Sequence, residues 1–203
     1  NIFCAVALGL SQHTALGKIA RAVARVNLIP GRMEFIPAFV KTSAGEQKEF
    51  TVVVDYAHTP DSLRKVYQTL REPVTSNQLL QVRKLICVLG SAGGGRDKWK
   101  RPELGKIAAE FCSRVILTNE DPYDENPDQI LSDIKSGVTS NQLLVTSIPD
   151  RREAIRMALR QAQAGDIVVI TGKGAEPWIA GPRGTKIPWN DKEIVGEELA
   201  RLK

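Results

Sequence analysis

The chain has few of the residues that build disulfide-rich domains or histidine metal centres. Its 203 residues include three cysteines and two histidines. Cys4, Cys87 and Cys112 are odd in number and form no CxxC pair, which argues against a disulfide framework or a zinc site and is typical of a reducing cytoplasm. Because His13 and His58 are scattered along the chain, we expect no metal site here.

Long apolar runs are also missing. The most apolar stretches, such as residues 167–170, have the length of a strand, whereas a membrane-spanning helix needs about 20 apolar residues. Residues 1–10 lack the basic flank and the cleavage site of a signal peptide. The sequence therefore predicts a protein without a membrane partner.

Neither sign of charge dominates the chain. Its 28 Lys and Arg residues exceed its 23 Asp and Glu residues by a net charge of +5. The basic residues are interleaved with acidic ones, so we expect no nucleic-acid partner, and a small polyanionic ligand explains the excess equally well. A hydrophobic content of 42% is that of a globular chain, which excludes a wholly disordered protein.

The chain changes character near residue 30. Residues 2–9 and 14–26 have helical periodicity, and Pro30-Gly31 then breaks the pattern. Beyond it, short β-branched runs alternate with amphipathic helices, which is the order of a mostly parallel sheet covered on both faces. The strands are expected at residues 51–55, 85–89, 115–118 and 167–171. We predict an α/β domain at residues 31–203, preceded by a short helical segment at residues 1–30.

Four loops rich in polar residues and glycine follow these strands, at the edge where parallel sheets bind ligands. The glycine-rich loop at residues 90–97 is not a P-loop, because Arg96 and Asp97 stand where a Walker sequence needs Lys and then Ser or Thr. Its glycines and cations instead suit a carboxylate or phosphate, although a solvated basic turn explains the same residues. The cations are Arg96, Lys98, Lys100 and Arg101.

The other three loops carry weaker signals. Asp55 can accept ribose hydroxyls and Tyr56 can stack on a base, while an ordinary capped turn explains both residues as well. Lys173 and Glu176 can hold the carboxylate and the ammonium of an amino acid. Residues 119–123 form an acidic turn, which is commonly just a polar loop.

Taken in order, these loops resemble the C-terminal region of the Mur ligases, of the UDP-N-acetylmuramyl-tripeptide synthetase (MurE) type. The resemblance covers residues 1 to about 180. The segments that carry it are Gly31-Arg32-Met33-Glu34, Asp55-Tyr56-Ala57-His58-Thr59-Pro60, Gly95-Arg96-Asp97-Lys98 with Lys100-Arg101-Pro102, and Gly172-Lys173-Gly174 with Glu176. It implies an ATP-dependent ligase that adds the third amino acid to UDP-MurNAc-L-Ala-D-Glu through an acyl phosphate, in peptidoglycan synthesis.

The resemblance also implies roles for individual residues. It implies that Asn1 lies at the adenine, that Arg32 reaches the γ-phosphate of ATP and that Asp55 binds the ribose. The residues expected to line the same nucleotide pocket are Tyr56, His58 and Pro60. The residues expected to bind the amino-acid substrate are Arg96, Asp121, Tyr123, Gly172 and Glu176. Arg32 and Lys173 are expected to take part in catalysis.

The domain organisation that the resemblance implies is a Rossmann-like C-terminal domain at residues 31–203, preceded at residues 1–30 by the last helices of a central ATPase domain. The P-loop and the Mg²⁺ ligands are expected in that upstream domain, so we expect this chain alone to be inactive. The implied cofactors are ATP and Mg²⁺. The implied partners are the UDP-MurNAc-dipeptide, an amino acid and the rest of the ligase chain, in the cytoplasm.

The identity of the third amino acid stays open. Glu120-Asp121-Pro122-Tyr123 stands where the diaminopimelate enzymes have Asp-Asn-Pro-Arg, and Ala175 stands where the family usually has histidine. Lysine, diaminopimelate and another diamino acid are therefore all candidates. Two further interpretations also stay open, namely a nucleotide-binding Rossmann module without catalysis and another Mur-like ligase of the folylpolyglutamate or cyanophycin type.

Overall fold

The computed structural model describes residues 2–26, 28–41, 47–71, 84–139 and 143–202. It divides into two compact units, residues 1–30 and residues 31–203, and the division falls where the sequence changes character. The first unit consists of helices α1 (Ile2–Ser11) and α2 (Leu16–Ala24). α1 is apolar in composition, yet none of its residues is buried within the described part of the chain. None of the described helices is long and apolar enough to cross a membrane.

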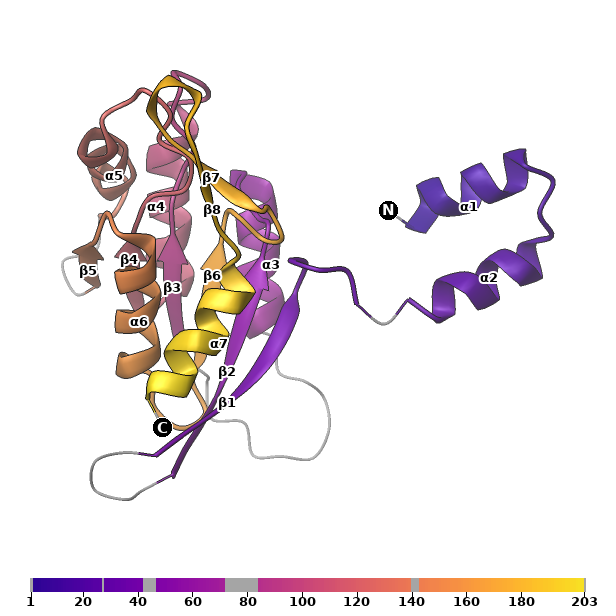
Figure 1. Ribbon diagram of the computed structural model, residues 1–203, viewed down its shortest axis with the longest axis horizontal. Coiled ribbons are helices and arrows are strands. Elements are labelled where there is room, and N and C mark those ends of the chain that lie inside the picture. The colour runs from indigo at the N-terminus through magenta and orange to yellow at the C-terminus, as the bar shows by residue number, and fades with distance from the viewer. Residues whose placement is uncertain (1, 27, 42–46, 72–83, 140–142, 203) are drawn as a thin grey trace. The chain divides into compact units, whose positions relative to one another are not determined.

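The second unit is built on a six-stranded sheet in the order β1-β2-β6-β3-β4-β5 (Figure 1). β1 runs antiparallel to β2, and the other neighbouring strands are parallel. The strands are β1 (Glu34–Lys41), β2 (Gln47–Asp55), β3 (Leu85–Leu89), β4 (Arg114–Leu117), β5 (Leu144–Ser147) and β6 (Ile167–Thr171). A separate hairpin pairs β7 (Trp178–Ala180) with β8 (Lys186–Pro188), and a 3-10 turn at Pro182–Gly184 joins them.

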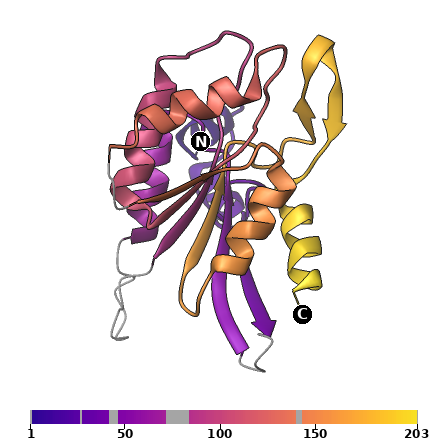
Figure 2. The ribbon, with the colours of Figure 1, turned by 90° about the vertical axis from the view of Figure 1, so that its left-hand side faces the viewer.

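Helices cover both faces of the sheet (Figure 2). α3, α4 and α5 pack on one face, and α6 and α7 pack on the other. Ile167 and Val169 point to the first layer, whereas Val168 and Ile170 point to the second, which explains why β6 is an unbroken apolar run. The helices are α3 (Pro60–Arg71), α4 (Lys100–Phe111), α5 (Pro127–Ser136), α6 (Arg151–Gln161) and α7 (Asp191–Arg201). The predicted α/β class is confirmed.

The sequence signals that worked are local. The strands expected at residues 85–89 and 167–171 have those bounds in the structure. Asn126 caps α5 by accepting the amide of Asp128 at 2.9 Å, and Asp150 caps α6 by accepting the amide of Glu153 at 3.0 Å. These side chains satisfy backbone donors that a helix start leaves free, so both helix starts could be predicted.

The edge strands and the last helix were not predicted. β1 contains Pro37, a residue that sheets accept on edge strands, and its alternating exposure hides any buried run. β5 has four residues and is largely exposed. An edge strand buries little apolar surface, so the signal that identifies central strands is weak there.

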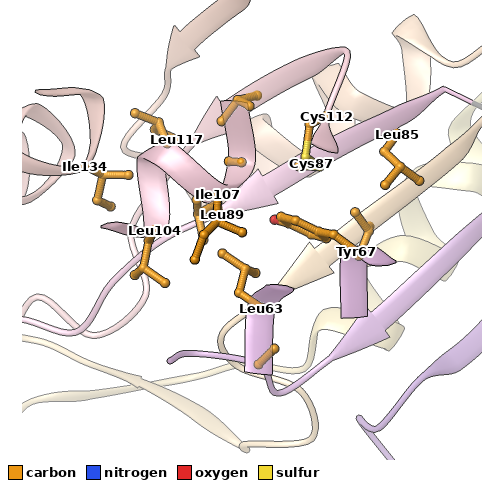
Figure 3. Close-up of a cluster of buried hydrophobic side chains, with 14 of the residues drawn as sticks. Leu63, Tyr67, Leu85, Cys87, Leu89, Leu104, Ile107, Cys112, Leu117 and Ile134 are labelled. Atoms are coloured by element: carbon orange, nitrogen blue, oxygen red, sulfur yellow. A yellow bond between two sulfur atoms is a disulfide. The ribbon is translucent and has the colours of Figure 1, made fainter. Parts of the chain in front are cut away.

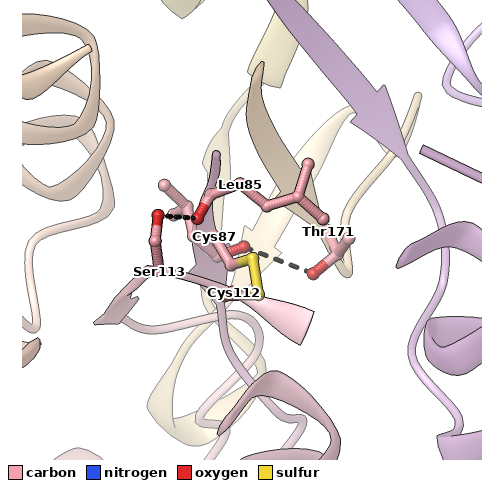
Figure 4. The surroundings of a disulfide bond; sticks show 6 residues. Leu85, Cys87, Cys112, Ser113 and Thr171 are labelled. Atoms are coloured by element: carbon pink, nitrogen blue, oxygen red, sulfur yellow. Dashed lines mark hydrogen bonds between the residues drawn. A yellow bond between two sulfur atoms is a disulfide. The ribbon is translucent and has the colours of Figure 1, made fainter. Parts of the chain in front are cut away.

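Cys87 and Cys112 are joined by a disulfide, which corrects the expectation drawn from the number and spacing of the cysteines (Figure 3). Cys87 lies in β3 and Cys112 follows α4, and the packing of α4 on the sheet brings their Cα atoms to 6.2 Å. Both are buried in the core between the sheet and helices α3 to α5. The hydroxyl of Ser113 donates to the carbonyl of Leu85 at 2.9 Å beside the bond (Figure 4). A separation of 25 residues gave the sequence no sign of this pairing.

We expect reduction of this disulfide to lower the free energy of unfolding by about 3 kcal/mol, because it releases a closed loop in the unfolded chain. The measurement is guanidinium unfolding with and without reductant on a Cys4→Ser background, since Cys4 is the exposed free thiol among the described residues. An intact mass that shows two free thiols at Cys87 and Cys112 before reduction would contradict the pairing.

Candidate functional site

The loops after β2, β3, β4 and β6 meet at one edge of the sheet, as the sequence predicted, and enclose a pocket of about 200 Å³. Charged and aromatic side chains from all four loops line it. They are Tyr56 and His58 after β2, Arg96, Asp97 and Lys100 after β3, Glu120, Asp121 and Tyr123 after β4, and Glu176 after β6. Parallel strands point their carboxyl ends to the same edge, which is why loops far apart in the sequence meet here.

A fully buried lysine joins two of these loops. The ammonium nitrogen of Lys173 lies 2.8 Å from Asp121 and 2.5 Å from Glu176. Asp121 also accepts the backbone amide of Ala180 at 2.6 Å, which attaches the β7–β8 hairpin to the same group. In this geometry the charge of Lys173 is shared between two carboxylates of the protein. Its expected catalytic role stays a prediction.

Tyr56 connects the loop after β2 to the loop after β6. Its hydroxyl donates to Glu176 at 2.8 Å, and this hydrogen bond, together with burial, raises the pKa of Tyr56 to about 12. Burial raises the pKa of Glu176, but the hydrogen bonds from Lys173 and Tyr56 outweigh it and hold the pKa below its usual value. The guanidinium of Arg32 lies 4.6 Å from the centre of the Tyr56 ring. The carboxylate of Glu176 is therefore held ionised and in place.

Glu120 is a buried carboxylate of the pocket. Its buried Oε2 atom makes no hydrogen bond with the described residues. Burial and the neighbouring Asp121 raise the pKa of Glu120, while Arg151, His58 and Lys100 oppose them. A buried carboxylate is costly without a cation or a donor, so this position favours a ligand that supplies one.

Gly172 makes room for Glu120. A Cβ atom at position 172 would lie 2.4 Å from Oε2 of Glu120, and the residue has φ of +107°, where side chains are strained. Only glycine fits both conditions without a shift of the Glu120 side chain.

We expect Gly172→Ala to lower the free energy of unfolding by about 2–3 kcal/mol, because it adds backbone strain and displaces a buried carboxylate. Gly196→Ala in α7 is the matched control, since a Cβ there meets no atom within 4 Å. That control should stabilise the helix by about 0.5–1 kcal/mol. Urea unfolding of both variants measures the two changes, and equal effects would contradict the role of Gly172.

The buried Arg101 side chain stabilises the glycine-rich loop. Arg101, expected from the sequence to face a ligand, is fully buried and lies 2.8 Å from Glu125 and 2.9 Å from Asp133. Glu125 also accepts the amide of Gly95 at 3.2 Å. Arg101 is therefore corrected to a structural cation.

Of the other three cations, Lys98 lies 2.9 Å from Glu125 and has a partner of its own. Arg96 and Lys100 both line the pocket. Arg96 is exposed, and its guanidinium lies 5.9 Å from the centre of the Tyr123 ring. These two cations are the ones placed to meet an anionic group of a ligand.

We expect Glu125→Gln to destabilise the protein by about 2 kcal/mol at pH 7 and to flatten its acid unfolding profile. The hydrogen bond from Arg101 is the main reason why the pKa of Glu125 is lowered in the folded state. A lowered folded-state pKa gives stability that is fully present above about pH 5 and is lost as the pH falls through the folded value. Urea midpoints between pH 7 and pH 2.5 test this, and parallel profiles for variant and wild type would contradict it.

Of the residues expected on the nucleotide side, Tyr56 and His58 line the pocket itself. Asp55 is buried, and its two oxygens accept the amides of Met33 and Ala57, each at 2.7 Å. Arg32 is exposed, and Pro60 begins α3. The roles expected for these three residues stay predictions. Asn1, expected at the adenine, lies outside the described residues.

Sequence reasoning missed a buried ion pair behind the site. Arg151 donates to both oxygens of Asp191, at 2.9 and 2.7 Å. Its guanidinium also donates to the carbonyls of Asn119 and Thr171, at 3.2 and 2.9 Å. These carbonyls immediately precede Glu120 and Gly172, so the pair holds both loops from the side of α6 and α7. No local signal could have revealed it, because Asp191 belongs to a helix 40 residues further along the chain.

Metal ligands are not grouped in the part of the chain that the structure describes. No set of three or more His, Cys, Asp or Glu side chains there could hold a metal ion.

Comparison with known proteins decides the family. A model of the "Mur ligase, glutamate ligase domain" family matches residues 31–174. The chain belongs to the Mur ligase family. The "UDP-N-acetylmuramoyl-L-alanyl-D-glutamate--2,6-diaminopimelate ligase" of Chlorobaculum tepidum is 41% identical over 198 residues, which are 98% of this chain and 35% of that protein. The protein of the same name from Gloeobacter violaceus is 40% identical over 99% of this chain and 38% of its own length.

Solved structures of Mur ligases have the same architecture. A structure of a UDP-N-acetylmuramoyl-L-alanyl-D-glutamate--2,6-diaminopimelate ligase matches with a TM-score of 0.70 and 36% identity, over 97% of this chain and 37% of that one. A murein peptide ligase from Psychrobacter arcticus matches with a TM-score of 0.58 at 16% identity, which shows a shared fold alone. The chain thus spans little more than a third of the length of the curated relatives it matches.

Proposed function

We propose that the chain is the C-terminal part of an ATP-dependent ligase that adds the third amino acid to UDP-MurNAc-L-Ala-D-Glu in peptidoglycan synthesis. The observation that carries this proposal is the charge arrangement of the pocket. Arg96 and Lys100 line it as cations beside the unpaired carboxylate of Glu120. An amino acid brings a carboxylate and ammonium groups, which these side chains complement. The names of the family members from Chlorobaculum tepidum and Gloeobacter violaceus support the same reaction.

Residues 1–30 are, in this proposal, the last helices of a preceding ATPase domain. Support comes from α1, whose apolar side chains are exposed, among them Phe3 at 87% and Ile2 at 64%. A helix that is apolar all round is stable when other parts of a protein cover it. The P-loop, the Mg²⁺ ligands and Asn1 at the adenine would then belong to that domain. Arg32, exposed and without an ion pair among the described residues, is free to reach the γ-phosphate.

The proposed reaction has two steps. The γ-phosphoryl group of ATP is transferred to the free carboxylate of the muramyl dipeptide, and the amine of the incoming amino acid then displaces phosphate to form the amide. Positioning and neutralisation of charge by cations dominate such transfers. The roles proposed for this chain are to hold the amino acid with Arg96, Gly172 and Glu176 and to bring Arg32 to the phosphate.

The requirement for ATP supports a cytoplasmic location. Disulfides are rare in the cytoplasm. A Cys87–Cys112 disulfide found in the thiol measurement would therefore count against this location.

The third amino acid is a diamino acid in this proposal. The relatives are named as diaminopimelate ligases. In this chain Tyr123 stands at the pocket where the resemblance led us to expect an arginine for a distal carboxylate, and Asp121 and Glu120 are acidic. Lysine, diaminopimelate and other diamino acids therefore all belong in the substrate test.

We expect the full-length protein of the parent reading frame to carry a Gly-Lys-Thr or Gly-Lys-Ser loop upstream and to release phosphate from ATP only with UDP-MurNAc-L-Ala-D-Glu and a diamino acid present. The assay is phosphate release with a panel of amino acids, and mass spectrometry identifies the product. ATP turnover that ignores the muramyl dipeptide but needs a folate or an aspartate polymer would indicate another Mur-like ligase. No turnover with any acceptor would favour a nucleotide-binding module.

A matched pair of variants tests the pocket in the same assay. Arg96→Gln should raise the KM for the amino acid by about 10- to 100-fold, because it removes a charged hydrogen-bond donor. Arg64→Gln is the control, since Arg64 makes a surface ion pair with Glu110 at 2.8 Å on the outer side of α3 and α4. Equal KM values for the two variants would contradict the proposed place of the amino acid.

A further inference from the structure

We propose that the Tyr56 hydroxyl is a positioning group that couples the nucleotide side of the site to the amino-acid pocket through Glu176. The inference rests on the proposed function, because it assigns the two sides to the two substrates of one ligase. Tyr56 follows β2 and has Arg32 against its ring, whereas Glu176 follows β6, and both Tyr56 and Glu176 line the pocket. Their hydrogen bond of 2.8 Å is a direct side-chain link between these two loops.

The link belongs to a continuous series of contacts. Arg32 lies over the Tyr56 ring at 4.6 Å, and Tyr56 donates to one oxygen of Glu176. The other oxygen of Glu176 accepts from Lys173 at 2.5 Å, and Lys173 also binds Asp121 at 2.8 Å. A shift of Arg32 on binding an anion would therefore reach both acidic loops of the pocket through groups that are already in contact.

The backbones of the same segments, at Gly31, Tyr56 and Gly174, are also in close contact. A Cβ atom at Gly31 would lie 2.1 Å from the amide nitrogen of Ala175, and one at Gly174 would lie 2.9 Å from Cβ of Tyr56. Glycine at both positions lets the three backbone segments touch. Because close-packed segments move together rather than independently, a displacement on the nucleotide side is passed to Glu176.

The Tyr56 hydroxyl orients Glu176 and does not itself contact a substrate in this proposal. Both oxygens of Glu176 are occupied, one by Tyr56 and one by Lys173, so the carboxylate has one orientation at the pocket wall. Without the hydroxyl, Lys173 is the remaining hydrogen-bond donor to Glu176 in the described structure, and that lysine is shared with Asp121. We therefore expect a poorly oriented Glu176 and an amino-acid site that no longer responds to the nucleotide. Coupling of this kind is reciprocal between the two ligands.

The test uses Tyr56→Phe in the full-length ligase, because this change removes the hydroxyl and keeps the ring beneath Arg32. We expect the KM for the amino acid to rise about tenfold while the KM for ATP changes less than about twofold. A non-hydrolysable ATP analogue should tighten amino-acid binding in the wild type and fail to do so in the variant. Tyr67→Phe is the matched control, since Tyr67 is fully buried in the core between the sheet and α3 and does not line the pocket, and it should leave both KM values unchanged.

A double-mutant cycle with Glu176→Ala separates positioning from direct binding. If Tyr56 acts through Glu176, then Tyr56→Phe changes the KM for the amino acid less than about twofold once Glu176 is absent. Additive effects of the two changes, or an unchanged KM in the single variant, would overturn the inference while leaving the ligase assignment intact. A wild-type enzyme without muramyl-dipeptide-dependent turnover would instead overturn the proposed function itself.

Discussion

The ammonium group of Lys173 lies fully buried between the carboxylates of Asp121 and Glu176, and the loops of the site depend on this arrangement. A buried ammonium without partners is strongly disfavoured, and a buried ion pair that loses one member leaves the other uncompensated. The group therefore joins the loop after β4 to the turn after β6. Through Asp121 and the amide of Ala180 it also holds the β7–β8 hairpin. One desolvated charge thus restricts three segments that the sheet alone would leave free.

Two further buried cations brace the same edge from opposite helix layers. Arg101 at the start of α4 holds Glu125 and Asp133, and Arg151 at the start of α6 holds Asp191 and two loop carbonyls. Arg101 and Arg151 are both paired within the protein and therefore do not serve as ligand-binding cations. Arg96, Lys100 and Glu120 line the pocket and take no part in these buried ion pairs. A rigid frame around a few free charges is what precise positioning of a ligand requires.

The parts of the fold that could be predicted are those whose signal is local. β3 and β6 are short apolar runs buried on both faces, and Asn126 and Asp150 are caps that act on amides two or three residues away. The edge strand β1 and the helix α7 were missed. β1 is exposed on alternate residues, and α7 itself has no strong apolar run. The pairing of Cys87 with Cys112 was also missed, since only the packing of α4 on β3 creates it.

The sequence by itself determined the α/β class, the order of the four loops and their meeting at one edge, because strand periodicity and the direction of parallel strands dictate these features. Only the tertiary structure decided which charges are free. Arg96 and Arg101 lie in one basic segment and look equivalent in the sequence. Arg96 is exposed, whereas Arg101 is buried and paired with the carboxylates of Glu125 and Asp133. The physical reason is that an ion pair depends on distance in space and on burial, and neither quantity is encoded by the neighbours of a residue along the chain.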